Sequence, residues 1–246
     1  MEKKRQIAAV LILLALIGLI AYRHSTGKDL EKYEASFFDV FDTQTQIIGY
    51  ASSKEQFSEQ MSLIKDKFQY YNDLYDIYHD YEGMNNIKTI NDNAGIQPVK
   101  VDEEIIELLK LGITMDEKTD GNMNIAMGSV LSIWHDYREA GSEDPYSAEL
   151  PPMDELEKAA EHTDIHNIVI DEEASTVYLT DPDMSLDVGS IGKGYAVQKV
   201  AEYAKNELGI RYMLFSVGGN VCAIGGHPDG SAWAVGIQNP DVESDQ

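Results

Sequence analysis

The residues best suited to chemistry lie in the stretch SLDVGSIGKGYAVQKV, residues 185–200. We expect Asp187 to end a strand and a helix to begin near Lys193. The free N–H groups at a helix N-terminus, together with a lysine, favour an anionic oxygen such as that of a phosphate. Gly189 and Gly194 would let a ligand approach the backbone. The glycine spacing matches neither a dinucleotide fold nor a P-loop, and the structural alternative is a glycine-rich connection that Asp187 caps.

A second stretch, TDGNMNIAMGSVLSIW, covers residues 119–134. Asn124 offers both a hydrogen-bond donor and an acceptor, and Met127 offers a polarizable apolar surface. These groups suit a flat heteroaromatic ligand, although a plain connection between two helices would have the same composition.

A third stretch, FSVGGNVCAIGG, covers residues 215–226. Gly218 and Gly219 within an apolar strand indicate a bulge, or a place where a ligand or another backbone comes close. Asn220 is near enough to reach such a ligand. The structural and the ligand-binding interpretations are equally open here.

Composition excludes several function classes. The 246 residues carry a formal net charge of −24, which argues against a nucleic-acid partner. The single cysteine, Cys222, excludes an intramolecular disulfide and a cysteine-based metal cluster, and we expect it to be a small buried core residue. No Ser-His-Asp, HExxH or CxxC pattern is present, and the histidines have no metal-ligand spacing.

The N-terminus predicts a membrane anchor. Lys3, Lys4 and Arg5 precede an uninterrupted apolar run, residues 7–22, which would rise about 24 Å as a helix. A basic flank before an apolar run is typical of a secretion signal or an uncleaved anchor, and no cleavage motif follows it. We therefore expect residues 1–28 to be a signal anchor and tether, with residues 29–246 on the extracytoplasmic side of the cell membrane.

The hydrophobic pattern predicts mixed helices and strands. Residues 24–36 read as a polar tether, 37–51 as a strand, 54–81 as a long helix with an aromatic end, and 82–95 as a loop or short turns. Helices are expected over residues 101–121, in AMGSVLSIWHDYREAG, in a short segment up to His162, and from about Lys193 to Leu208, where Gly209 closes the helix. NIVID and TVYLT read as a hairpin, and YMLFSVGGNVCAIGG and AWAVGIQNP as two further strands. This order favours an α+β fold with mixed layers over a doubly wound parallel sheet.

The three stretches, in this order, resemble the ApbE family, the FAD:protein FMN transferases. There the counterparts read T-G-G-x-F-D-x-T-V-G-P-L-x-x-x-W, L-D-L-G-G-I-A-K-G-Y-A-V-D and L-x-N-x-G-G-D-I-x-A-x-G, followed by a G-I-x-x-P strand that is VGIQNP here. DTQTQIIGYA and NNIKTIN fall where the family has M-G-T-x-x-x-I and S-E-L-S-R-I-N. The resemblance covers about residues 37–240.

The resemblance implies a transferase that uses FAD and Mg²⁺. Such an enzyme attaches the FMN part of FAD to a Thr or Ser hydroxyl of a partner flavoprotein and releases AMP. Asp187 and Lys193 match contacts to the flavin nucleotide, and the backbone carbonyl of Ser190 matches a Mg²⁺ ligand. The FAD site as a whole would be formed by Phe41, Tyr81, Asn124, Ala126, Met127, Asp187, Lys193, Gly218, Gly219 and Asn220.

This chain departs from the family pattern in two ways. Phe41 and Asp42 replace Met and Gly, Asn124 and Asn220 replace Asp, and Gly192 replaces Ala. In addition, the family's later H-x-I-x-D-P-x-T-G and D-x-x-x-T motifs do not follow before Gln246, so we expect the catalytic residues beyond it and a fold that lacks its C-terminal part. We expect this chain alone to have weak or no transferase activity. The alternatives are an FAD pyrophosphatase that yields FMN and AMP, and a non-catalytic flavin-binding domain.

Overall fold

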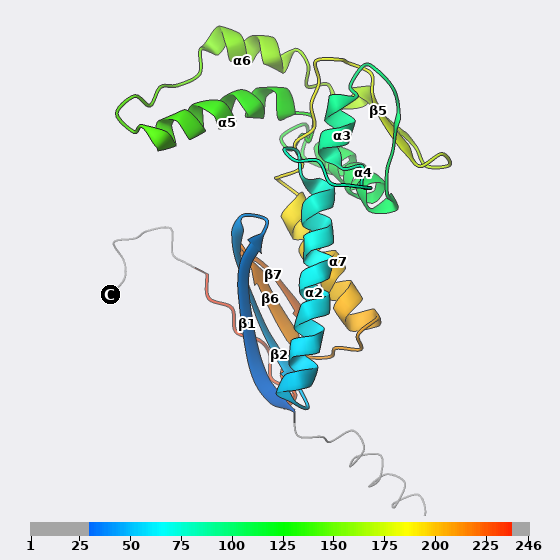
Figure 1. Ribbon diagram of the computed structural model, residues 1–246, viewed down its shortest axis with the longest axis vertical. Coiled ribbons are helices and arrows are strands. Elements are labelled where there is room, and N and C mark those ends of the chain that lie inside the picture. Colours follow the sequence, from blue (N-terminus) through cyan, green and yellow to red (C-terminus); the bar gives the residue numbers. More distant parts are fainter. Residues whose placement is uncertain (1–29, 238–246) are drawn as a thin grey trace, which may run out of the picture.

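The computed structural model describes residues 30–237 (Figure 1). The expected anchor, residues 7–22, lies outside this part, and within residues 30–237 no helix is both long and apolar enough to cross a membrane.

The elements run in the order β1 (Glu31–Val40), β2 (Thr43–Ala51), α2 (Lys54–Tyr75), α3 (Ile87–Asp92), β3 (Val99–Lys100), α4 (Glu103–Lys118), α5 (Gly128–Glu143), α6 (Met153–Ala160), η1 (Ile165–Asn167), β4 (Ile168–Asp171), β5 (Thr176–Leu179), α7 (Gly192–Asn206), β6 (Met213–Val217) and β7 (Asn220–Ile224).

The described strands form two antiparallel sheets. The larger has the order β1-β2-β6-β7, with Ile47 of β2 opposite Ala35 on one side and Phe215 on the other. The smaller has the order β3-β5-β4. Helices α2 and α7 lie together along one face of the larger sheet (Figure 1). This arrangement confirms the expected α+β class.

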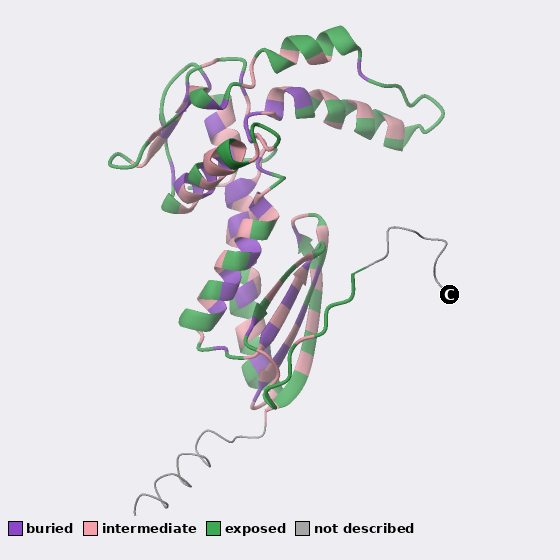
Figure 2. Cartoon of the chain, turned by 180° about the vertical axis from the view of Figure 1, so that it is seen from behind, coloured by how far each residue is buried: buried purple, intermediate pink, exposed green. Residues whose placement is uncertain are grey.

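The core lies between the larger sheet and these two helices. Along β2 the inward residues Thr45 and Ile47 are buried and the intervening Gln46 is exposed, as the two-residue period of a strand requires. On α2 a buried stripe faces the sheet, and its Phe68 packs against Phe215 with ring centroids 6.3 Å apart. Figure 2 shows this buried layer, in contrast to α6, which has no buried residue.

Helices α5 and α6 form an arm that projects from the rest of the chain at the end opposite the sheet (Figure 1). Helix α6 packs back on α5, where the Ser129 hydroxyl donates a hydrogen bond of 3.1 Å to the Ala159 carbonyl. The base of α5 is fixed to the body, because the Gly128 N–H donates to the Ser185 carbonyl over 2.9 Å. The arm therefore has one firm attachment beside residues 185–188.

The expected tether and first strand are wrong in their bounds. Strand β1 begins at Glu31, inside the segment that we expected to be a tether, because Tyr33 and Phe37 face the core while the alternate residues face solvent. The expected strand over residues 37–51 is two strands. They are joined by a tight turn at Phe41 and Asp42, whose φ angles of 54° and 48° leave the extended region.

Two further expectations fail in the region after α2. The helix ends at Tyr75, not at residue 81, because the Asp76 backbone is extended and its side chain accepts the N–H groups of Tyr78 and His79. The segment 82–95, expected to lack a regular element, contains α3. Asn86 begins that helix with a capping box shared with Thr89.

The C-terminal strands also differ from the prediction. YMLFSVGGNVCAIGG forms the hairpin β6–β7, not a single strand, since Gly218 and Gly219 make a two-residue turn with φ of 52° and 89°. Residues 232–237 of the expected last strand are not in a strand. Cys222 is half-buried on β7 and does not belong to the buried core. Helix α7 and its closure at Gly209, where φ is 66°, are confirmed.

Candidate functional site

One cavity of about 510 Å³ lies where the β1–β2 turn, the end of α2 and the start of α7 meet. Four of the predicted site residues line it: Phe41, Tyr81, Asp187 and Lys193. The first two are more than a hundred residues from the last two in the sequence. The remaining lining residues are Asp39, Asp42, Asn72, Tyr75, Asp76, Ile77, Tyr78, His79, Arg138, Val188, Gly189 and Gly192.

The turn before α7 places Asp187 and Lys193 on this cavity. The Asp187 Oδ1 accepts the Gly189 N–H over 2.8 Å, so the structural interpretation of Asp187 as the cap of the turn is confirmed. Its Oδ2 accepts no hydrogen bond from the residues that the structure describes, which leaves that oxygen available to a ligand. Lys193 lies in the first turn of α7, is half-buried, and forms no ion pair within residues 30–237.

The segment that carries Asp187 is held from two sides. The Asn91 side chain forms two hydrogen bonds with the Leu186 backbone, donating over 3.0 Å and accepting over 2.8 Å. The Asp187 N–H donates to the Ile125 carbonyl over 2.9 Å. Residues 184–188 are not in a strand, so the expectation that Asp187 ends a strand is wrong. The hydrogen bonds of Leu186 and of the Asp187 N–H satisfy the backbone and fix the carboxylate without the support of a sheet.

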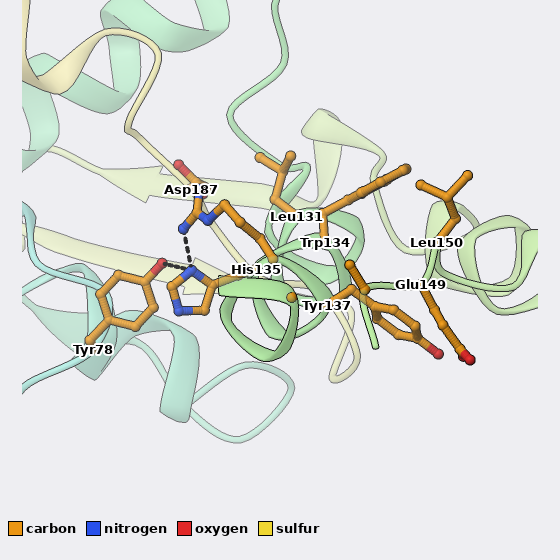
Figure 3. Close-up of a pocket in the computed structure, with 11 residues that line it drawn as sticks. Tyr78, Leu131, Trp134, His135, Tyr137, Glu149, Leu150 and Asp187 are labelled. Atoms are coloured by element: carbon orange, nitrogen blue, oxygen red, sulfur yellow. Dashed lines mark hydrogen bonds between the residues drawn. The ribbon is translucent and has the colours of Figure 1, made fainter. Parts of the chain in front are cut away.

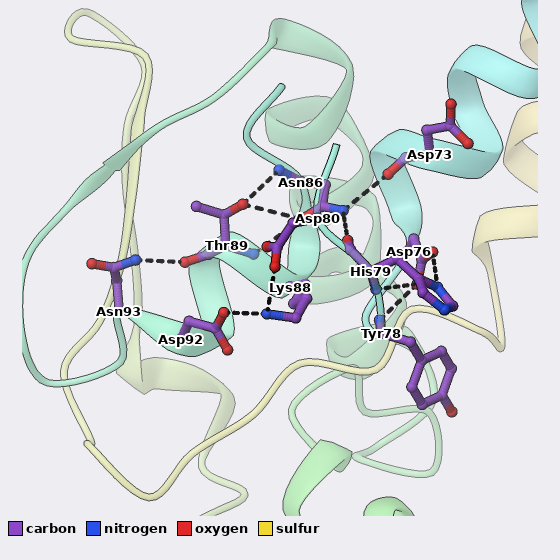
Figure 4. Close-up of polar contacts among 10 residues, drawn as sticks. All are labelled: Asp73, Asp76, Tyr78, His79, Asp80, Asn86, Lys88, Thr89, Asp92 and Asn93. Carbon is purple, nitrogen blue, oxygen red and sulfur yellow. Dashed lines mark hydrogen bonds and ion pairs between the residues drawn. The ribbon is translucent and has the colours of Figure 1, made fainter. Parts of the chain in front are cut away.

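Asp76 organises the aromatic wall of the cavity, and Figure 4 shows its contacts with Tyr78 and His79. Its carboxylate accepts the Tyr81 hydroxyl over 2.7 Å and the His79 Nδ1 over 2.9 Å, in addition to backbone N–H groups. Burial of Asp76 opposes ionisation, but the hydrogen bonds from Tyr78, Tyr81 and His79 outweigh it and lower the pKa of this carboxyl. An ionised Asp76 thus holds both the turn and the Tyr81 ring in place.

Asn86 holds residues 76–82 through its buried side chain. Its side chain is fully buried; it donates to the carbonyls of Asp73 and His79 and accepts the Thr89 N–H over 3.0 Å, as Figure 4 shows. A buried amide with its polar atoms satisfied ties α2, the 76–82 turn and α3 into one unit.

The β1–β2 turn forms the opposite side of the cavity. The Phe41 N–H donates to the Asn72 Oδ1 of α2 over 2.7 Å, which holds the turn against that helix. Both turn residues have positive φ, a conformation that Asp tolerates better than most residues and that glycine adopts freely. The replacement of the family glycine by Asp42 is therefore compatible with this backbone and adds a carboxylate to the cavity.

A second cavity of about 550 Å³ adjoins the first along helix α5 (Figure 3). The two share Tyr78, Arg138 and Asp187 as lining residues. The second is more apolar, since its other lining residues are Leu131, Trp134, His135, Tyr137, Gly141, Ala148, Glu149 and Leu150. The site is thus a cleft with a charged part beside α7 and an aromatic part beside α5.

The charged part combines two cations with four carboxylates. Lys193 and Arg138 face the same cavity as the carboxylates Asp39, Asp42, Asp76 and Asp187. Carboxylate oxygens are ligands that Mg²⁺ prefers. Within residues 30–237, however, no three of these carboxylates place oxygen atoms within 4.8 Å of one another, so they do not form a preassembled Mg²⁺ site. Ser190, the predicted Mg²⁺ ligand, is exposed in the turn between Asp187 and α7 and does not line either cavity.

The predicted residues of the second stretch do not line the cleft. Asn124 donates to the Thr163 carbonyl over 2.8 Å and accepts the Ala126 N–H over 2.7 Å, so its side chain serves the local backbone. Ala126 is fully buried, and Met127 is the residue before α5. None of the three lines either cavity. Their segment instead supports Asp187 through the Ile125 carbonyl.

The predicted residues of the third stretch lie beside the start of α7. Gly218 packs on Thr43, since a Cβ at this glycine would lie 2.6 Å from the Thr43 hydroxyl, so a close backbone approach is the role the structure gives it. Asn220 donates to the Val217 carbonyl over 3.3 Å, and its Oδ1 lies 3.2 Å from the Cβ position of Gly194. Neither these residues nor Gly219 line the two cavities.

Sequence reasoning missed several residues of the site. Arg138 gave no signal because it belongs to no quoted motif. Tyr78 belongs to the aromatic end of the expected helix, which the sequence favours as packing over a stacking surface. The Asn at 86 followed by Thr three residues later is a recognisable helix start, and could have placed α3. His162, Asp181 and Asp183 place ligand atoms within 4.8 Å of one another, but they line neither cavity, and the His162–Asp181 ion pair of 2.9 Å accounts for the cluster.

Comparison with known proteins gives a consistent result. The ApbE family pattern matches residues 41–246. The FAD:protein FMN transferase of Escherichia coli K12 is 26% identical over 180 residues, which cover 72% of this chain and 50% of that protein. That of Treponema pallidum is 29% identical over 167 residues, 63% of this chain and 44% of that protein. The chain spans about half the length of the relatives it matches.

Solved structures show the same fold. The flavin transferase ApbE from Vibrio cholerae superposes with a TM-score of 0.70 at 20% identity, covering 86% of this chain and 65% of that one. The ApbE protein from Thermotoga maritima gives a TM-score of 0.70 at 25% identity, with coverage of 86% and 64%.

Proposed function

Because the chain belongs to the ApbE family, we propose that it is the nucleotide-binding portion of an FAD:protein FMN transferase. The observation that carries the proposal is the convergence of Phe41, Tyr81, Asp187 and Lys193 on one cavity. Similar proteins over this region are named FAD:protein FMN transferases. FAD combines flat rings with a pyrophosphate, and the cleft combines aromatic side chains with two cations.

The residues of the cleft suit distinct parts of that ligand. Lys193 and the free N–H groups of the first turn of α7 favour phosphate oxygens. The free Oδ2 of Asp187 suits a hydroxyl or ring N–H donor, since a carboxylate would repel phosphate. Phe41 and the Tyr81 ring provide flat apolar surfaces for a heterocycle. This division gives the aspartate and the lysine of one turn different tasks.

The proposed reaction replaces the phosphoanhydride linkage of FAD by a phosphate ester to the acceptor protein. The hydroxyl oxygen of a Thr or Ser on the acceptor protein forms a bond to the phosphorus of the FMN half, the pyrophosphate bond breaks, and AMP leaves with the bridging oxygen. The hydroxyl proton passes to a base. Mg²⁺, when bound, would neutralise charge on the pyrophosphate, with the Ser190 carbonyl as the donor that the resemblance assigns. The chain's own contribution is to hold the nucleotide and to offset its charge through Lys193.

The experiment is an incubation of the full-length chain with FAD, Mg²⁺ and a candidate extracytoplasmic flavoprotein. The proposal predicts a fluorescent flavin-labelled acceptor band and release of AMP in equal amounts. Free FMN and AMP without labelling would instead identify an FAD pyrophosphatase. Bound FAD without any product would identify a flavin-binding domain. Failure to bind FAD at all would refute all three.

We also propose that residues 7–22 anchor the protein in the cell membrane with the cleft on the extracytoplasmic side. The proposal rests on the apolar run and the preceding basic residues Lys3, Lys4 and Arg5. Protease added to intact spheroplasts should digest the domain, and high salt should not release the protein from membranes. Protection from the protease would place the domain on the other side.

A further inference from the structure

Arg138 occupies a position in the cleft that no family motif covers. It lies on α5, four residues after the last residue of the second motif, and it lines both cavities together with Tyr78 and Asp187. Its side chain is exposed to the cleft. A role for Arg138 therefore has to be derived from its own surroundings.

The Arg138 side chain is held in place by His135. Its Nη2 lies 2.7 Å from the His135 Nδ1, and the Tyr78 hydroxyl lies 3.4 Å from the same nitrogen. Arginine can only donate, so Nδ1 acts as the acceptor, while Nε2 lies 3.1 Å from a Glu139 carboxylate oxygen. His135 also stacks on Tyr78, with ring centroids 5.0 Å apart (Figure 3). The guanidinium is thus oriented by its contacts, although none of them neutralises its charge.

Neither Arg138 nor Lys193 forms an ion pair in the described part of the chain. Within residues 30–237 six of the twelve lysines have a carboxylate oxygen within 4.0 Å, and these are Lys32, Lys65, Lys67, Lys88, Lys110 and Lys199. Arg138 and Lys193 line the cavity of about 510 Å³ together with the carboxylates Asp39, Asp42, Asp76 and Asp187. Two cations on different helices that line one cavity, neither of them held in an ion pair, can both contact an anion bound there.

We propose that Arg138 is a phosphate-binding residue and that it holds the pyrophosphate of FAD together with Lys193. This inference rests on the proposed function. The planar guanidinium can donate two parallel hydrogen bonds to one phosphate group, whereas Lys193 acts as a point charge. The arm formed by α5 and α6 thereby contributes directly to nucleotide binding.

The test compares FAD with riboflavin, which has the same ring system and no phosphate. Arg138→Ala in the full-length chain should weaken FAD binding about tenfold, as expected for the loss of a charge-assisted hydrogen bond. Riboflavin binding should change by less than about twofold, because no phosphate contact is lost. Arg138→Lys should recover part of the FAD affinity. Fluorescence quenching or calorimetry measures both ligands.

A matched control removes an equal charge from the same arm. Lys158 lies on α6, is exposed and lines neither cavity, so Lys158→Ala should leave FAD affinity within about twofold of the wild type. Equal losses in the two variants would mean that only the overall charge matters, and would overturn the inference. So would equal losses of FAD and riboflavin in Arg138→Ala, which indicate a packing role.

The failure of this inference can be distinguished from that of the proposed function. Wild-type binding of FAD with an unchanged Arg138→Ala affinity overturns the role of Arg138 alone. If the wild type does not bind FAD, the proposed function fails, and the pyrophosphate assignment fails with it. Circular dichroism and the melting temperature of each variant should match the wild type, since the Arg138 side chain is exposed.

Discussion

Replacing Asn86 by alanine tests how the aromatic wall of the cleft is held. The Asn86 side chain is fully buried and forms hydrogen bonds of 3.1 Å to the Asp73 carbonyl, 2.8 Å to the His79 carbonyl and 3.0 Å from the Thr89 N–H. Each intramolecular hydrogen bond contributes about 1 kcal/mol, and buried partners left unsatisfied add to the loss. We therefore expect Asn86→Ala to lower the free energy of unfolding by about 3 kcal/mol.

The assay is urea unfolding of the full-length chain followed by circular dichroism. Asn85→Ala is the matched control, because Asn85 is exposed and donates a single hydrogen bond of 2.8 Å to the Lys100 carbonyl. It should lose less than about 1 kcal/mol. FAD affinity should also fall in Asn86→Ala at low urea, since the segment that carries Tyr78 and Tyr81 loses its anchor. Equal losses of stability in the two variants would refute the anchoring role of Asn86.

Two further predictions concern packing and pH. A Cβ at Gly128 would lie 2.6 Å from the Ser185 carbonyl oxygen, so Gly128→Ala should lower the free energy of unfolding by about 1–3 kcal/mol. A Cβ at Gly192 would lie 3.6 Å from its nearest neighbour, so Gly192→Ala should raise that free energy by up to about 1 kcal/mol. Chemical unfolding measures both changes, and the same sign for both would contradict the packing. The hydrogen bond that His162 donates to the Asp181 carboxylate raises the pKa of His162 above its usual 6.5. This pair therefore stabilises the fold below about pH 6.5 and loses its effect as the pH rises through the raised pKa. The melting-temperature difference between the wild type and His162→Gln should accordingly shrink from about pH 6 to about pH 9, and a difference independent of pH would refute the ion pair.

Much of the fold follows from local patterns in the sequence. The start of α7 near Lys193 and its end at Gly209 were predictable, because a glycine turn and a left-handed glycine bound an apolar stripe. The hairpin β4–β5 was predictable from its alternating pattern. The cleft was predictable in part: Asp187 and Lys193 lie together on its wall, as the turn suggested.

Other features depend on contacts that a local pattern does not contain. The end of α2 at Tyr75 is set by the side chain of Asp76, which accepts backbone N–H groups of the following residues. The apolar residues after Asp76 keep the spacing of a helix, so the sequence pattern alone does not show this end. A pair of glycines such as Gly218 and Gly219 is expected both at a ligand contact and in a hairpin turn. Only the pairing of Val217 with Asn220 shows that these two form a hairpin turn.

The role of the second stretch could not be predicted for a related reason. Asn124 has the hydrogen-bonding groups of a ligand contact, but its partners are the Thr163 carbonyl and the Ala126 N–H. Its segment acts through the hydrogen bond from the Asp187 N–H to the Ile125 carbonyl, between residues 62 positions apart. Conversely, Arg138 enters the cleft only because α5 passes beside Asp187.

The measurement that tests the central claim most directly is the affinity of the full-length chain for FAD with and without Lys193. This cation lies in the first turn of α7, half-buried and without an ion pair in the described part of the chain, so Lys193→Ala should weaken FAD binding about tenfold or more with little change in melting temperature. A riboflavin titration of the same variant should be unchanged. Wild-type affinity for FAD in Lys193→Ala would contradict the placement of the phosphates at this turn, and with it the assignment of the cleft.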